Sequence, residues 1–110
     1  MIASRTKMIH FLREAEEIPL KKLWIGEPDP LPETPIRIHK QARILLPLSG
    51  SKHLLFASGG RHYNTIFTPG DAIVTHPSGW TCELWDREHR MISVVFRETC
   101  IRVIYIAHNG

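Results

Sequence analysis

Cysteine is scarce in this chain, and its scarcity excludes two kinds of small protein. The 110 residues contain only Cys82 and Cys100, too few for a disulfide framework. No two cysteines stand two residues apart, so the usual start of a zinc or dithiol redox motif is missing. We therefore expect reduced thiols and a core stabilised by apolar packing.

Long hydrophobic runs are also missing. Residues 1–17 lack the uninterrupted apolar core of a signal peptide, and no stretch approaches the roughly 20 apolar residues of a membrane span. We expect a cytoplasmic protein without membrane contact. With 43% hydrophobic and 23% charged residues in 110 positions, the composition is that of one globular domain.

Positive charge is present but is not concentrated. Fourteen Lys and Arg against 11 Asp and Glu give a net charge of +3. The only tight basic group is Arg37, His39, Lys40 and Arg43, which we interpret as a solvated strand edge rather than a phosphate site. Because the chain has no basic helix face, it should bind DNA only weakly and in a salt-sensitive manner.

Motifs for catalysis are absent. The sequence has no Gly-x-Ser-x-Gly elbow, and Gly59-Gly60 is better explained as a hairpin turn than as a phosphate loop. None of the seven histidines has a second one at a spacing that would place both on one face of a strand or helix. A metal site would need distant strands, for example His53, His62 and His76. We therefore predict no catalytic residue, no metal, no cofactor and no enzyme activity.

Residues 1–35 are predicted to form an N-terminal arm. Apolar residues at helical spacing indicate a short helix that Pro19 ends: Met8, Phe11, Leu12 and Ala15. Lys22 to Gly26 can form a short strand. The proline-rich linker from Glu27 to Pro35 cannot supply ladder donors and should lie extended over the surface.

Residues 36–110 are predicted to form the main body. Short apolar or alternating runs are separated by turn signals such as Thr68-Pro69-Gly70-Asp71, which suits a type II turn. The runs are Ile36 to Leu48, His53 to Ala57, Tyr63 to Phe67, Ala72 to Thr75, Thr81 to Trp85, Met91 to Phe96 and Ile101 to Ala107. Strands at this spacing predict an antiparallel sandwich or barrel.

Two of these runs have the composition of a pocket wall. Alternation sends three residues of the first run to one face: Trp80, Cys82 and Leu84. It does the same in the next run for Met91, Ser93 and Val95. If both faces point into a small barrel, they combine an apolar wall with a thiol and a hydroxyl, which suits a small ligand. The alternative is that these side chains simply fill the core.

The turns resemble those of one protein family. The stretches concerned are Leu48-Ser49-Gly50, Thr68-Pro69-Gly70-Asp71-Ala72, Pro77-Ser78-Gly79-Trp80 with Trp85, and Val94-Val95-Phe96-Arg97. Over roughly residues 36–109 they look like the N-terminal cupin domain of AraC-family transcription regulators. The resemblance implies an all-β fold, a cupin-like antiparallel β-barrel (double-stranded jelly roll), preceded here by a helical and extended N-terminal arm.

The resemblance implies effector sensing. It places a small-molecule effector inside the barrel, against Ser49, Trp80, Cys82, Leu84, Met91 and Ser93. Metal-binding cupins carry two histidines one residue apart, which this chain lacks, and Cys82 stands at the position of their later ligand histidine. Family members continue with a helical linker that often dimerises and with helix-turn-helix units. The chain contains no recognition helix, so DNA contact would come only through a domain absent from it, and a homodimer is allowed.

Three questions stay open at this point. The chain is either a fragment of a longer regulator or a stand-alone sensing domain. A metal-dependent cupin enzyme acting on a small metabolite is the first alternative function, and elemental analysis would detect its metal. A barrel that serves only for dimerisation is the second, and it would show no thermal shift with any small molecule.

Overall fold

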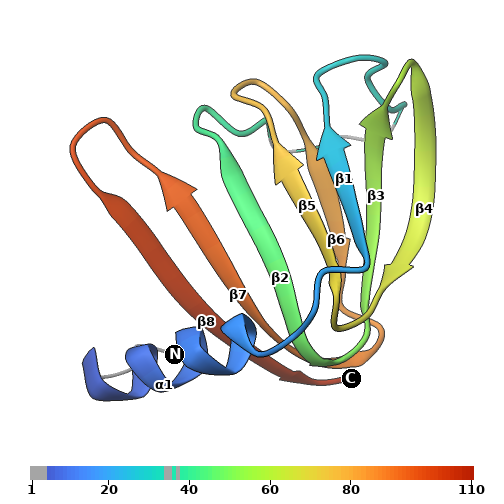
Figure 1. Cartoon of the computed structure of the whole chain (residues 1–110). Helices are drawn as coiled ribbons and strands as arrows, with labels where there is room; N and C mark the ends of the chain where they lie inside the picture. Colours follow the sequence, from blue (N-terminus) through green and yellow to red (C-terminus); the bar gives the residue numbers. More distant parts are fainter. Residues whose placement is uncertain (1–4, 34–35, 37) are drawn as a thin grey trace.

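The structure, a computed structural model, describes residues 5–33, 36 and 38–110. The elements in chain order are α1 (Arg5–Glu16), β1 (Lys22–Gly26), β2 (Arg43–Gly50), β3 (Lys52–Ser58), β4 (Arg61–Phe67), β5 (Asp71–Thr75), β6 (Thr81–Leu84), β7 (Glu88–Phe96) and β8 (Ile101–Asn109). A five-stranded sheet, sheet A, has the order β1-β5-β2-β7-β8, and a three-stranded sheet, sheet B, has the order β4-β3-β6 (Figure 1).

The two sheets confirm a mostly β fold of the sandwich type, but the expectation of a closed barrel is wrong. Within the described residues, no ladder joins sheet A to sheet B. Closure would need an edge of sheet B to pair with an edge of sheet A. β6 has only four residues, and the prolines that follow β1 lack the N–H groups that a ladder needs. All ladders are antiparallel except β1–β5, which is parallel.

Two turns expected from the sequence are confirmed. Asp71 N donates to Thr68 O at 2.9 Å, and Gly70 has φ 101°, as a type II turn requires. Gly59 and Gly60, with φ 56° and 77°, connect β3 to β4 in a two-residue hairpin turn. These turns fix which strand faces meet inside the sandwich.

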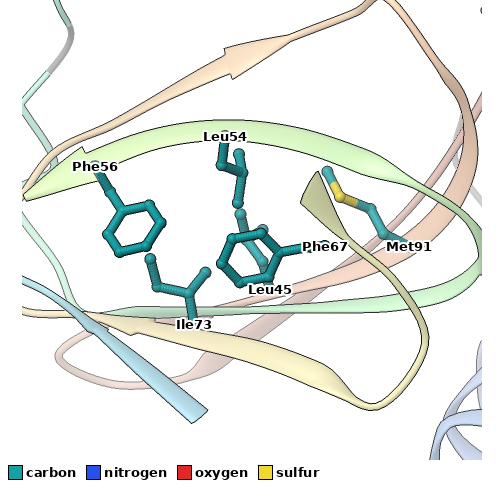
Figure 2. Close-up of a cluster of buried hydrophobic side chains, with 6 residues drawn as sticks. All are labelled: Leu45, Leu54, Phe56, Phe67, Ile73 and Met91. Atoms are coloured by element: carbon teal, nitrogen blue, oxygen red, sulfur yellow. The ribbon is translucent and has the colours of Figure 1, made fainter. Parts of the chain in front are cut away.

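An apolar cluster fills the interior between the two sheets. It consists of Leu45, Leu54, Phe56, Phe67, Ile73 and Met91 (Figure 2). Trp24 from β1 packs against it, with its ring edge-on to Phe56. Full burial of a side chain of this size stabilises the folded state by about 1.5–3 kcal/mol, so this cluster defines the inner face of each strand.

α1 covers part of the opposite, outer face of sheet A, where Figure 1 shows it crossing the ends of β2, β7 and β8. Phe11 stacks on Tyr105 with ring centroids 3.7 Å apart. Arg90 donates to both carboxylate oxygens of Glu14, at 2.8 and 2.9 Å. The amphipathic helix expected from the sequence is therefore confirmed. No described helix has the length and apolar content needed to cross a bilayer.

The segment before the proline-rich linker is part of the sandwich. β1 has the bounds expected for it and joins sheet A beside β5. The linker then lies against sheet B, where Pro30 O accepts hydrogen bonds from Trp80 Nε1 at 3.3 Å and His62 Nε2 at 2.9 Å. Thr34 and Pro35, at the end of the expected linker, lie outside the described residues.

Candidate functional site

The inner face of β6 is not the one expected. In the β3–β6 ladder, Glu83 stands opposite Leu54 and Cys82 stands opposite Leu55. Leu54 belongs to the buried cluster, so Glu83 shares the inner face with it. Cys82 and Leu84 therefore lie on the outer face of sheet B. The expectation that these two side chains face the interior is wrong.

Trp80 explains the error. Its side chain is buried, but its partners are His62 and Pro30 on the outer side of sheet B, where the proline-rich linker covers it. Alternation correctly groups Trp80 with Cys82 and Leu84. It cannot tell which of the two faces is inside, and here a linker rather than a second sheet buries the tryptophan.

The remaining predicted site residues lie on sheet A. Met91 and Ser93 are buried on the inner face of β7, Met91 as part of the apolar cluster. Ser49 is half-buried at the irregularity in the β2–β7 ladder that lies between Pro47 and Ser49. The structure therefore does not bring the six predicted residues into one site, and only Ser93 lines the cavity described next.

A cavity of about 530 Å³ lies against the inner faces of β2, β7 and β8. Five basic side chains line it, one lysine, three arginines and one histidine: Lys40, Arg43, Arg97, Arg102 and His39. Ile38, Val95 and Ile104 supply apolar wall. Its described lining contains no acidic residue, so the cavity combines positive charge with aliphatic surface.

Strand register explains why two of these arginines lie on the same face of sheet A, on either side of Val95. Arg43 on β2 stands opposite Val95 on β7, and Val95 stands opposite Arg102 on β8. Residues directly opposite one another point to the same face of a sheet. Arg43 and Arg102 therefore flank Val95 in a single row across three strands. The row before it contains Ser93 and Ile104, which extends the same wall.

The segment before β2 forms another side of the cavity. The run Ile36 to Leu48, expected as one strand, is interrupted: Ile38 makes only an isolated bridge with Trp80, and the regular ladder begins at Arg43. Between them, His39 N donates to Gly79 O at 3.0 Å and Ser78 N donates to His39 O at 2.7 Å. These bonds hold His39 and Lys40 beside the cavity.

The tight basic group of the sequence is thus part of the site. His39, Lys40 and Arg43 line the cavity, and the Arg43 side chain is only 13% exposed. Arg43 Nη1 donates to the His39 ring, 3.1 Å from Nε2. The interpretation of this group as a solvated strand edge is wrong for Arg43. Arg37, its fourth member, lies outside the described residues.

A buried charge network forms the floor behind Arg43. Arg43 Nη2 lies 3.6 Å from one carboxylate oxygen of Glu83, and Lys52 Nζ lies 3.6 Å from the other. Arg43 Nη2 also donates to Ser93 Oγ at 3.3 Å, while the buried Arg43 Nε has no hydrogen-bond partner among the described residues. Glu83 is the one carboxylate between two cations, Arg43 and Lys52, so this group of three side chains has a net positive charge.

Burial changes the titration of two further groups inside the sandwich. Desolvation lowers the pKa of Lys52, although Glu83 acts in the opposite direction. Desolvation also lowers the pKa of His89, whose Nδ1 donates to Arg87 O at 3.0 Å. Both side chains are almost fully buried. Burial therefore disfavours the charged forms of both side chains.

The structure does not bring the three distant-strand histidines together. His53 contacts Asp86 and Asn64, and His62 contacts Pro30. Across the residues that the structure describes, no three His, Cys, Asp or Glu side chains gather in a group that could hold a metal ion.

The arrangement is suited to binding. Guanidinium groups offer paired donors that match carboxylate and phosphate oxygens, and the aliphatic side chains beside them suit the apolar body of a small molecule.

Compared with known proteins, the chain matches no protein-family model, and searches of the curated proteins and of the solved structures likewise give no match.

Proposed function

We propose that this chain is a small-molecule sensing domain whose cavity binds an organic anion carrying a carboxylate or phosphate group. One observation carries the proposal: Arg43, Arg97 and Arg102 line one cavity of about 530 Å³ together with aliphatic side chains. A cavity of that volume is in the range of small-molecule sites, which combine apolar wall with a few placed polar groups.

The neighbours of Arg43 favour an anion over a neutral ligand. Its guanidinium is held by His39, Ser93 and Glu83, so little side-chain freedom remains to be lost on binding. Because Glu83 is shared with Lys52, the positive charge behind the cavity is only partly neutralised. An incoming carboxylate or phosphate supplies the missing negative charge.

The sequence resemblance supports sensing rather than catalysis. The turns around Pro69-Gly70-Asp71 and Pro77-Ser78-Gly79 resemble those of the N-terminal cupin domain of AraC-family transcription regulators. In this proposal the sandwich is a cupin-like jelly roll in the cytoplasm, and the anion is its effector. Contact with DNA belongs to a separate helix-turn-helix domain.

The test compares each of a panel of small carboxylates with its own neutral amide, by thermal denaturation and titration calorimetry. We expect carboxylates to raise the melting temperature and the matching amides to have no effect. A ligand at 100 times its Kd stabilises the native state by about 2.7 kcal/mol. Equal effects of acid and amide, or no shift with any compound, would contradict the proposal.

A pair of variants locates the site. Arg102→Gln should weaken carboxylate binding at least about tenfold, because hydrogen bonds to charged groups contribute about 1.5–3 kcal/mol. Arg61→Gln is the matched control, since Arg61 is an exposed arginine at the start of β4 and does not line the cavity. Equal losses in the two variants would indicate non-specific attraction to a basic protein.

A further inference from the structure

We propose that two copies of this chain associate through β8, which pairs antiparallel with β8 of the second copy so that sheet A continues across the dimer. The inference concerns the edge of the sheet and does not depend on the ligand of the cavity. It rests on four observations: the less protected edge of β8, its regular ladder, an aliphatic row that leads to it, and its self-compatible charges.

β8 differs from the other sheet edges. An edge strand presents unpaired N–H and C=O groups, and proteins protect such edges with short strands, charges or prolines. β6 has four residues and carries the inward-facing Glu83. β1 has five residues, begins with Lys22 and is followed by the proline-rich linker. β4 begins with the exposed Arg61 and His62.

β8 has fewer of these protective features than the other edge strands. It is nine residues long and contains no proline, glycine or acidic residue. Its single permanent charge, Arg102, lines the cavity. Its ladder with β7 runs without a register shift from Ile101 to Asn109, so the strand presents a regular row of backbone groups on its other side.

An aliphatic row on the outer face of sheet A leads to this edge. Five residues stand directly opposite one another on consecutive strands, none of them fully buried: Ile25, Val74, Ile44, Val94 and Val103. Beside the row, Phe96 and the strongly exposed Ile101 stand opposite each other. In Figure 1, α1 crosses the other end of this face, and Val94 and Val103 pack against the apolar cluster that α1 covers. Pairing through β8 would continue the row into the second copy.

The charges of β8 are compatible with pairing to a second copy of the same strand. With the two-fold axis at Ile104, antiparallel pairing sets Ile101 opposite Ala107 and Arg102 opposite Ile106 of the other copy. No like charges then face each other across the seam, and cross-strand pairs of this kind stabilise a sheet. The arrangement is self-complementary, as the interfaces of two-fold dimers are.

Sedimentation equilibrium of the whole chain provides the first test, and we expect a concentration-dependent dimer. The double variant Ile101→Glu/Ala107→Glu places two glutamates opposite each other at both ends of the seam. It should weaken association at least about 100-fold, because facing like charges cost several kcal/mol. Both positions are exposed, so the fold should be kept. Leu20→Glu is the matched control, since Leu20 is 63% exposed and Ile101 is 61% exposed.

A second double variant, with opposite charges, tests the strand register. It also shows whether any loss of the dimer in the double glutamate variant comes from misfolding. Ile101→Glu/Ala107→Lys sets opposite charges across the seam and should restore the dimer. Hydrogen exchange supplies a readout of the backbone: alternate amides of β8 should be protected in the native dimer and lose that protection in the double glutamate variant.

Four results would overturn the proposal. They are a native chain that stays monomeric, a dimer that survives the double glutamate variant, a charge reversal that restores nothing, and a dimer whose β8 amides exchange freely. Equal dissociation by Leu20→Glu would also count against β8 as the seam.

Discussion

Lys52 and Trp85 are in direct contact at one end of the sandwich, with the ammonium nitrogen 3.5 Å from the centroid of the indole ring. The lysine side chain is only 1% exposed, and Nζ also donates to Leu84 O at 3.3 Å. A buried ammonium needs such partners because its desolvation is costly. Glu83 is the group that neutralises it, and the same carboxylate neutralises Arg43.

Glu83→Gln should therefore be strongly destabilising. It leaves Arg43 and Lys52 facing each other without the carboxylate between them, and removal of one partner from a buried ion pair costs about 3–5 kcal/mol. Because Glu83 is 20% exposed, we expect a loss near the lower end, about 3 kcal/mol in the free energy of unfolding. Urea denaturation at neutral pH measures it. Glu98→Gln, at an exposed position, is the control, and a loss below about 1 kcal/mol at Glu83 would contradict the network.

His89 should reduce stability in mildly acidic solution. Burial lowers its folded pKa below the usual 6.5, so the unfolded chain takes up a proton near pH 6.5 that the folded chain refuses. The free energy of unfolding then falls as the pH drops below 6.5, until the folded pKa is reached. His89→Asn keeps a donor for Arg87 O and should flatten this slope. Urea denaturation in steps of pH from 7.5 downward measures the change.

His53 provides the opposite sign. Its hydrogen bond to Asp86 raises the folded pKa above 6.5, so its contribution to stability is fully present below pH 6.5 and is lost as the pH rises through the folded pKa. In the native chain the free energy of unfolding therefore falls as the pH rises above 6.5, and His53→Gln should abolish this fall. If both variants change the pH profile in the same direction, the assignment of His89 as a neutral buried group is wrong.

Alanine substitutions at Gly50 and Gly59 distinguish the cost of backbone strain from the cost of a steric clash. Both have positive φ, 70° and 56°, so an alanine at either position meets the left-handed penalty of about 1–2 kcal/mol. A Cβ at Gly50 would lie 2.2 Å from Glu88 O, whereas a Cβ at Gly59 meets nothing within 4 Å. We expect Gly50→Ala to cost at least about 2 kcal/mol more than Gly59→Ala in urea denaturation. Equal costs would show that the backbone around Glu88 yields easily.

Val95→Trp should close the cavity. Val95 lies between Arg43 and Arg102 and is half-buried, so the larger ring can extend into open space. The loss of stability should therefore be smaller than the cost of overpacking a filled core, which is about 1–3 kcal/mol. The stabilisation by carboxylates should disappear while the melting temperature without ligand changes little. Cys82→Trp is the control: Cys82 lies on the outer face of sheet B, so the response to carboxylates should persist. The reverse pattern would place the ligand against β6.

The strands and turns could be predicted from local sequence signals, because those signals are short-range. The sequence allows a short strand at Lys22–Gly26, and the structure has one. The Thr68–Asp71 turn follows from the fixed φ of Pro69 and the positive φ of Gly70. The face of β6 could not be predicted in this way. Alternation gives the grouping of Trp80 with Cys82, but only long-range packing decides that their face is outside.

The cavity was harder to predict than the strands. Its basic lining comes from β2, β8 and the connections beside them, and only the β2–β7 and β7–β8 registers place Arg43 and Arg102 on either side of Val95. The signal that existed was the tight group around His39, Lys40 and Arg43. Its charge was visible in the sequence, whereas the break in the strand at residues 39–42 that directs it toward the cavity was not.

The row formed by Arg43, Val95 and Arg102 has a kinetic consequence. Arg43 is far from the other two in sequence, so the row exists only after the long loop between β2 and β7 has closed, a slow step in folds rich in distant contacts. The β7–β8 hairpin can form earlier without completing the row. An anion bound there stabilises the native state but not the early part of the folding path. If the row is completed only after the folding transition state, such a ligand slows unfolding and leaves the rate of folding unchanged.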